Sequence, residues 1–71
     1  MGRELVECHA GYSYAQRPTA LWWAGERLEV ETVEVEQRVP TGRRFVVRTR
    51  GGHRFELLYD ESEDGWELNP V

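Results

Sequence analysis

Residues 27–59 read RLEVETVEVEQRVPTGRRFVVRTRGGHRFELLY, and the alternation and turns of this stretch decide the fold. β-Branched and aromatic residues recur at every second position in three runs, which Pro-Thr-Gly and Gly-Gly separate. Such alternation indicates half-buried strands, and proline and glycine mark the turns between them. The stretch therefore predicts three consecutive antiparallel strands. The first is rich in glutamate, the second in arginine and the third in apolar residues.

The first of these runs changes its alternation halfway. Leu28 and Val30 occupy even positions, whereas Val33 and Val35 occupy odd ones. A regular strand would place the two pairs on opposite faces. One extra residue near Glu31 restores a single apolar face, so the sequence predicts a β-bulge there. The competing interpretation is a helix, which the many β-branched residues of the run disfavour.

Pro40-Thr41-Gly42 is expected to form a three-residue hairpin loop with glycine as its left-handed residue. That loop pairs Val39 with Arg43. Two faces follow from this register. The apolar face holds Val33, Val35, Phe45 and Val47, and the polar face sets Glu34 and Glu36 beside Arg44, Arg48 and Arg50.

The second turn lies around Gly51-Gly52, and the alternation requires an odd-length loop. A two-residue Gly-Gly turn would pair apolar with charged residues, which a half-buried sheet does not tolerate. Two three-residue loops remain open. A loop over residues 51–53 sets Arg48 opposite Glu56, and a loop over residues 50–52 sets Arg48 opposite Arg54.

Alternation outside this stretch predicts three more short strands, at residues 3–10, 20–23 and 66–68. Loops are expected over residues 11–19, where a short helical turn within residues 12–17 stays open, and over the acidic residues 60–65. About six short strands at these spacings are typical of a small antiparallel barrel or rolled sheet. The chain is therefore predicted to form one all-β domain over residues 1–71.

Composition narrows the class of protein. The chain has 71 residues, 39% of them apolar, and a net charge of −4 that opposes non-specific binding to nucleic acid or anionic membrane. All nine basic residues are arginines, which excludes lysine-based Schiff-base and phosphate-loop chemistry. The one cysteine excludes an internal disulfide. Neither a secretion signal nor an apolar run of membrane-spanning length is recognised, so we expect a cytoplasmic protein without a membrane partner.

Candidate catalytic and metal-binding residues do not assemble into a site. Cys8 and His9 are adjacent on a predicted strand and point to opposite faces, so they form no nucleophile–base pair. Only His53 remains as a further good metal ligand, far along the chain. The carboxylates divide between a strand face and an acidic loop without the spacing of an EF-hand. We therefore expect no enzyme activity, no metal and no cofactor.

Arginines and aromatic residues carry two hypotheses about binding. Arg44, Arg48 and Arg50 alternate on one strand face, and small barrels that bind single-stranded nucleic acid combine arginines with stacking aromatics. The glutamates expected opposite these arginines favour a cross-strand charge ladder instead. The nucleic-acid function is therefore the alternative hypothesis.

The leading hypothesis is a protein-interaction module. Tyr12, Tyr14, Trp22 and Trp23 cluster before the long strands. Adjacent tryptophans on a regular strand point to opposite faces, so one is expected in the core and the other either outside or beneath the loop over residues 11–19. An exposed tryptophan beside a tyrosine is suited to a protein contact. The partner and the oligomeric state stay open.

The chain also resembles a group of small bacterial all-β proteins. The resemblance rests on Arg17-Pro18-Thr19-Ala20-Leu21-Trp22-Trp23-Ala24-Gly25-Glu26-Arg27-Leu28-Glu29-Val30, on Phe45-Val46-Val47-Arg48-Thr49, on Phe55-Glu56-Leu57-Leu58-Tyr59-Asp60 and on Trp66-Glu67-Leu68. Some members of that group are encoded near genes for lesion-bypass DNA polymerases. The resemblance carries no catalytic residue, and it implies a link to DNA repair.

Overall fold

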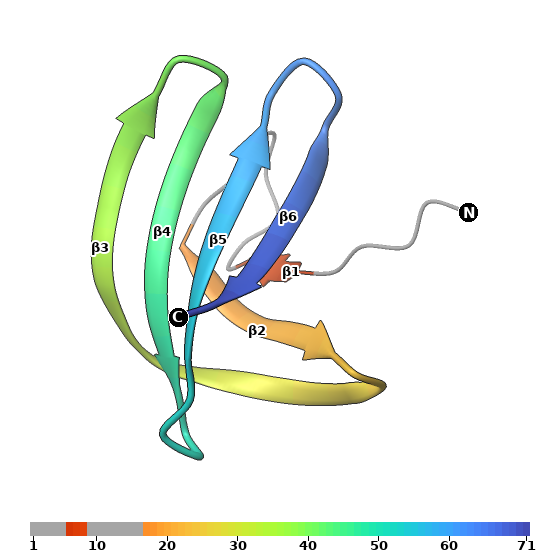
Figure 1. Cartoon of the computed structure of the whole chain (residues 1–71), viewed down its shortest axis with the longest axis vertical. Helices are drawn as coiled ribbons and strands as arrows, with labels where there is room; N and C mark the ends of the chain where they lie inside the picture. Colours follow the sequence, from red (N-terminus) through yellow and green to blue (C-terminus); the bar gives the residue numbers. More distant parts are fainter. Residues whose placement is uncertain (1–5, 9–16) are drawn as a thin grey trace.

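The computed structural model describes residues 6–8 and 17–71, and this part of the chain forms six strands and no helix. Every strand pairs antiparallel with the next, so the order in the sheet is that of the sequence (Figure 1). The strands are β1 (Val6–Cys8), β2 (Pro18–Trp23), β3 (Glu26–Val39), β4 (Gly42–Thr49), β5 (Arg54–Asp60) and β6 (Gly65–Pro70). The predicted all-β class and the rolled antiparallel sheet are thereby confirmed.

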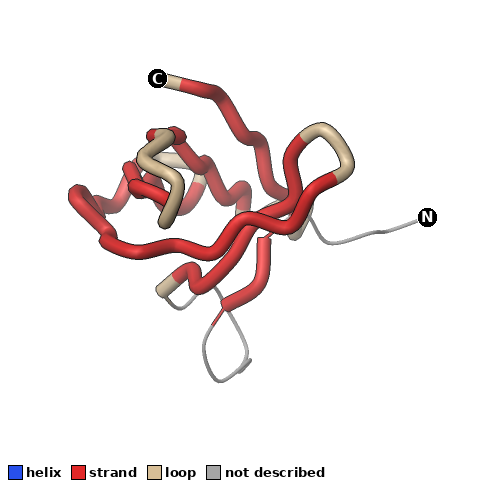
Figure 2. Tube along the Cα trace, turned by 90° about the horizontal axis from the view of Figure 1, so that it is seen from below, coloured by secondary structure: helices blue, strands red, loops and turns tan. Residues whose placement is uncertain are grey.

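The sheet is curled into a half-barrel because β3 takes part in both of its halves. This 14-residue strand pairs with β2 through its first residues and with β4 through its remainder. Figures 1 and 2 show the strand bending between the two halves. The register shifts between Val30 and Thr32, so the β-bulge predicted near Glu31 is confirmed.

The first hairpin differs from its prediction. Val39 pairs with Gly42, so Pro40-Thr41 is a two-residue turn and the predicted three-residue loop, with Val39 opposite Arg43, is wrong. Gly42 lies in β4 and not in the turn. A Cβ atom on Gly42 would overlap the carbonyl oxygen of Tyr59, so glycine is needed for a close approach between β4 and β5.

A second bulge also changes the predicted apolar face. The register shifts again between Val33 and Val35, which leaves Val35 opposite Val46 and 38% exposed. Val35 is therefore wrongly assigned to the core side, whereas Val33, Phe45 and Val47 pack in or against the core as predicted. Nothing within β3 signals this second shift, because Val33 and Val35 keep the spacing of a regular strand.

The second hairpin has the predicted odd length. Arg48 pairs with Arg54, and the backbone N–H of Thr49 donates to His53 at 2.8 Å, so the loop is residues 50–52. Gly52 has a φ of 93°, which glycine adopts without strain. Like charges directly opposite each other are unfavourable. Glu34 offsets them, because its carboxylate lies 3.5 Å from the Arg48 guanidinium and 2.9 Å from that of Arg54.

The core lies on the concave side of the curled sheet. Every strand contributes to it except β3, whose apolar residues pack around its margin. Trp66 covers Phe45 and Tyr59, with ring centroids 5.9 and 4.9 Å away. The buried residues that form this core cluster are Val6, Leu21, Phe45, Val47, Phe55, Leu57, Tyr59 and Leu68.

Three sequence expectations concern the flanking strands. Strand β2 begins earlier than predicted, at Pro18, and β6 runs from Gly65 to Pro70 in place of the predicted residues 66–68. Of the strand predicted at residues 3–10, only Val6–Cys8 is described. The turn considered within residues 12–17 falls outside the described residues, apart from Arg17. Residues 6–8 and 17–71 include no apolar helix of the length needed to cross a membrane.

Candidate functional site

Trp22 and Trp23 end strand β2, and both side chains are exposed, at 41% and 38%. The prediction that one of them lies in the core is therefore wrong. By strand alternation Trp23 shares the face of the buried Leu21, but it lies at the end of the strand. Its ring contacts Phe55 with centroids 5.4 Å apart and a tilt of 57°, so the core covers only part of it.

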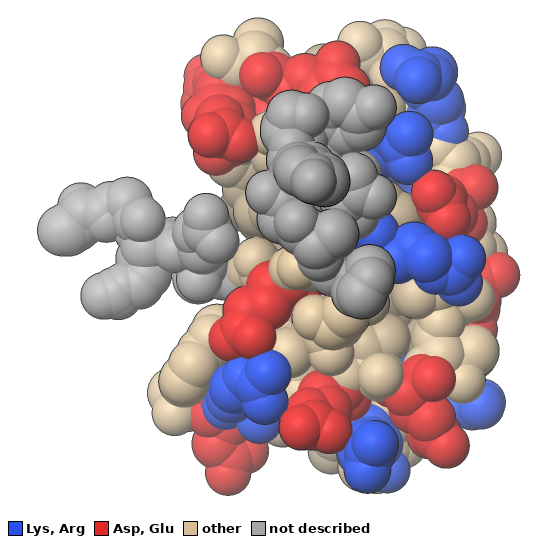
Figure 3. All heavy atoms as spheres, turned by 180° about the vertical axis from the view of Figure 1, so that it is seen from behind, with Lys and Arg blue, Asp and Glu red and all other residues tan. Residues whose placement is uncertain are grey.

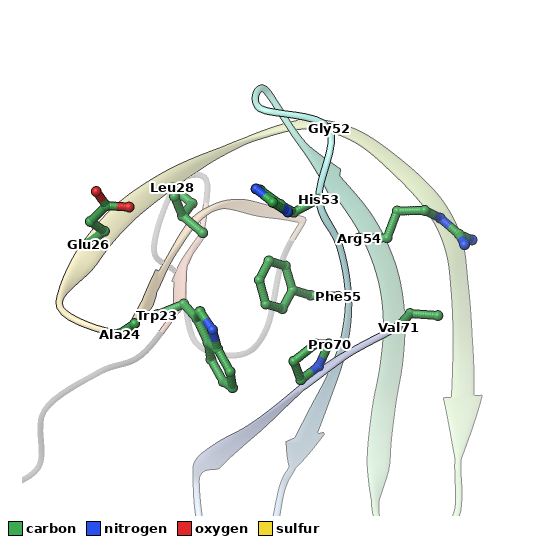
Figure 4. A pocket seen from close by; sticks show the side chains of 10 residues that line it. All are labelled: Trp23, Ala24, Glu26, Leu28, Gly52, His53, Arg54, Phe55, Pro70 and Val71. Carbon is green, nitrogen blue, oxygen red and sulfur yellow. The ribbon is translucent and has the colours of Figure 1, made fainter.

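Trp23 forms one wall of a groove of about 440 Å³ at the end of the half-barrel. Leu28, Phe55, Pro70 and Val71 supply most of its remaining apolar surface. Figure 4 shows the Trp23, Leu28 and Phe55 side chains directed toward a common space, with Pro70 on the opposite side. These residues come from strands β2, β3, β5 and β6 and from the residue after β6, so the groove exists only in the folded sheet.

Three polar side chains border this groove: Glu26, His53 and Arg54. The Arg54 guanidinium donates to Glu34 at 2.9 Å, and Figure 4 shows it directed away from the groove. Among the described residues, Glu26 has no ion-pair partner. The rim of the groove thus carries one uncompensated carboxylate.

Trp22 has a different environment from Trp23. Its indole N–H donates to the Glu7 carboxylate at 3.2 Å, which also accepts from Arg27 at 3.0 and 2.9 Å. The Arg27 hydrogen bond is the main reason that the pKa of Glu7 lies below its ordinary value. Trp22 therefore helps to hold the short strand β1 on β2, and it stays partly exposed on the face of β2 opposite to that of Trp23.

Arg44, Arg48 and Arg50 are each engaged by a carboxylate. Arg44 lies 2.6 Å from Glu56, Arg48 lies 3.5 Å from Glu34, and Arg50 lies 3.1 Å from Glu29. These pairs form a cross-strand charge ladder of the kind that the sequence predicts. Figure 3 shows acidic and basic side chains interspersed on the visible face, without one large basic patch.

The acidic turn between β5 and β6 is held by its own hydrogen bonds. The Asp60 carboxylate accepts from the backbone and hydroxyl of Ser62, at 2.9 and 2.8 Å. The Tyr59 hydroxyl donates to Asp64 at 2.5 Å, and this bond is the main cause that raises the pKa of Tyr59 to about 12. Within the described ranges, no group of three histidine, cysteine or acidic side chains could hold a metal ion.

Four other residues were considered in the sequence. Tyr12 and Tyr14, proposed as partners of the tryptophans, lie outside the described residues. Cys8 packs half-buried against the core, as expected of a small apolar side chain. His9 is not described, so the expectation that these neighbours form no catalytic pair stays a prediction.

Sequence reasoning identified Trp23 but missed the other walls of the groove. Leu28 was assigned to the apolar face of its strand, and no binding role was predicted for Leu28, Phe55 or Pro70. No local pattern brings these residues together, because the groove depends on the curl of the whole sheet. The apolar pair Pro70-Val71, which follows the strand predicted at residues 66–68, is a sequence signal that could have pointed to it.

The geometry of the groove is what bears on function. Its lining combines apolar and aromatic side chains with a comparable share of polar surface, its rim carries the Glu26 carboxylate, and the nearby arginines are engaged in ion pairs. The chain was also compared with protein-family models, with curated proteins and with solved structures, and none of these comparisons found a match.

Proposed function

We propose that this protein is a non-enzymatic interaction module that binds a protein partner through the groove beside Trp23 and through the exposed Trp22 ring of the same strand. The observation that carries the proposal is the exposure of Trp23 at 38% while it forms a wall of the 440 Å³ groove. Tryptophans that are partly exposed beside a concave apolar surface dominate the energetics of many protein contacts. A small domain gains nothing for folding by leaving such a ring uncovered.

A capture experiment tests the proposal. The tagged protein is incubated with a bacterial lysate, and retained proteins are identified by mass spectrometry. Trp22→Ala and Trp23→Ala are expected to lose the partner that the unaltered chain retains. Val35→Ala is the matched control, because Val35 is as exposed as Trp23 but lies away from the groove. Identical retained proteins for all three variants, or none for the unaltered chain, would contradict the proposal.

The resemblance to the group of small bacterial proteins suggests one specific candidate partner, a lesion-bypass DNA polymerase. Such a polymerase is expected to bind the unaltered chain and to lose binding to Trp23→Ala. Equal binding of the polymerase to the unaltered chain, to Trp22→Ala and to Trp23→Ala would place the contact elsewhere on the molecule.

A second candidate function is binding of single-stranded nucleic acid. One observation favours it: Arg48, Arg50 and Arg54 lie around the β4–β5 hairpin, and Arg54 borders the groove that Trp23 lines. Phosphate would have to displace Glu34 and Glu29 from these arginines. Titration with a single-stranded oligonucleotide at low salt, where phosphate contacts are strongest, tests it through tryptophan fluorescence. An unchanged fluorescence signal excludes this function.

A further inference from the structure

We propose that the groove binds an extended peptide in the polyproline-II conformation that places a basic residue next to Glu26. This inference rests on the proposed function, because it names the chemistry of the partner at the same site. Three features of the groove support it: its aromatic wall, the adjoining sheet edge and its rim charge.

The aromatic wall offers both apolar surface and a hydrogen-bond donor. The Trp22 N–H is bonded to Glu7, whereas in the described part of the chain no acceptor is found for the Trp23 N–H. Peptides in the polyproline-II conformation have no internal hydrogen bonds, so their carbonyl groups are free to accept one. A helical ligand already uses its carbonyls internally. Trp23 therefore favours an extended ligand that packs on its ring and accepts from its N–H.

The sheet edge at the groove disfavours the other kind of extended ligand, an added β-strand. Strand β6 forms this wall and reaches Pro70, which has no backbone N–H. The next N–H, that of Val71, already donates to the carbonyl of Arg54 at 3.0 Å. A strand added here would find no backbone donor at the groove, whereas a polyproline-II ligand needs only the side-chain donor of Trp23.

The rim charge sets the preference for a basic residue. Glu26 lines the groove without an ion-pair partner among the residues described, while Arg54 is neutralised by Glu34. The net charge of −4 also attracts a basic peptide over longer distances. His53 is the remaining titratable group of the rim.

Two-dimensional NMR of the isotope-labelled protein tests the inference with four synthetic peptides of equal length. The first combines spaced prolines with one arginine, and the second replaces that arginine by glutamate. The third replaces the prolines by glycines, and the fourth forms a stable helix. Both proline peptides are expected to shift the indole N–H signal of Trp23, the arginine peptide at the lower concentration, whereas the glycine and helical peptides are not. The glutamate peptide is expected to bind more weakly, by about 5-fold at most, the range for one exposed charge pair.

Variants separate the two contributions of Trp23. Trp23→Phe keeps a ring and removes the N–H, so affinity should fall about 2- to 12-fold, as for one lost hydrogen bond. Trp23→Ala should cost about 30-fold or more, as for a binding hot spot. Glu26→Arg touches no core side chain and should reverse the preference between the arginine and glutamate peptides. Val35→Ala, away from the groove, should leave all affinities unchanged.

Failure of this inference is distinguishable from failure of the proposed function. A partner protein whose capture requires Trp23, together with no Trp23 signal shift by proline peptides, would refute the peptide chemistry and leave the function standing. Capture of the same partner by Trp23→Ala as by the unaltered chain would refute the function itself. Self-association that shifts the same signals with protein concentration, or binding of an oligonucleotide at the groove, would also refute the inference.

Discussion

Gly42→Ala is expected to destabilise this protein far more than an alanine at any turn glycine. A Cβ atom at position 42 would overlap the Tyr59 carbonyl oxygen and lie 3.1 Å from the backbone nitrogen of Glu61. Both neighbours are backbone atoms, so no side chain can rotate away. The methyl group can be accommodated only if β4 and β5 move apart where Gly42 pairs with Asp60.

The magnitude of this effect follows from two terms. Overpacking of a close-packed interior costs about 1–3 kcal/mol in the free energy of unfolding. Separation of the strands also strains the bond in which the Glu61 N–H donates to Thr41 at 2.8 Å, and a bond of this kind contributes about 1 kcal/mol. Since 1 kcal/mol shifts the midpoint of a domain of this size by about 4–8 °C, a total of about 2–4 kcal/mol should lower it by more than about 8 °C.

Urea and thermal unfolding, followed by circular dichroism, measure this loss. Gly51→Ala is the matched control, because a Cβ atom there would meet only the His53 ring, at an ordinary 3.6 Å. Gly42→Asn discriminates between the two roles that a glycine can have. Asparagine tolerates the left-handed conformation of a turn, so it would rescue a turn glycine. At a position where two backbone segments approach closely, asparagine should destabilise the protein at least as much as alanine. Equal stability of Gly42→Ala and Gly51→Ala would refute the argument.

Three further predictions concern ionisable groups. The Tyr59 pKa of about 12, which the hydrogen bond to Asp64 and burial raise from 10, means that the folded state keeps the phenol proton longer than the unfolded chain. The resulting contribution of Tyr59 to the free energy of unfolding is fully present below pH 10 and is lost as the pH rises toward 12. In urea unfolding, Tyr59→Phe should abolish this part of the pH dependence. The pKa of Glu7 is lowered, chiefly by Arg27, so its contribution is present above the ordinary pKa of 4.5 and lost as the pH falls through the folded value. Hydrogen exchange should accordingly show lower protection of the Val6–Cys8 amides in acid, and Glu7→Gln should lower it at neutral pH. Equal protection of these amides in all three cases would contradict this role of Glu7. Glu34→Gln should cost about 0.5–2 kcal/mol in urea unfolding, because two ion pairs are lost and Arg48 is left opposite Arg54. Addition of 1 M NaCl should narrow that difference by screening the two arginines, and a loss that salt leaves unchanged would argue against charge as the cause.

Local alternation was enough to predict much of this sheet. The parity change between Val30 and Val33 located the first bulge, because only one extra residue keeps both side chains on the core side. The same reasoning gave the odd length of the loop after Thr49. Both features express a requirement of the strand itself, that its apolar side chains share one face, and such a requirement is visible in the sequence.

Features that depend on distant residues were not predictable in this way. Gly42 was assigned to the turn because turns commonly contain glycine, but its neighbour is Tyr59, from another strand. Trp23 was expected either in the core or outside it. It lies between the two because Phe55 covers one side of its ring and Pro70 stands across the groove. The curl of the sheet creates both situations, and the alternation within one strand does not reveal it.

The outer face of β4 explains why the arginines of the charge ladder are committed to the fold. Val46 lies on this face between Arg44 and Arg48, with Val35 and Glu56 opposite it, and yet it is only 5% exposed. Arginine stems cover apolar surface while their charged ends stay in water, and carboxylates on the neighbouring strands hold both guanidinium groups. A phosphate ligand that drew these arginines away would break the ion pairs and expose Val46. A peptide bound in the Trp23 groove would leave these ion pairs intact, because neither Arg44 nor Arg48 lines the groove.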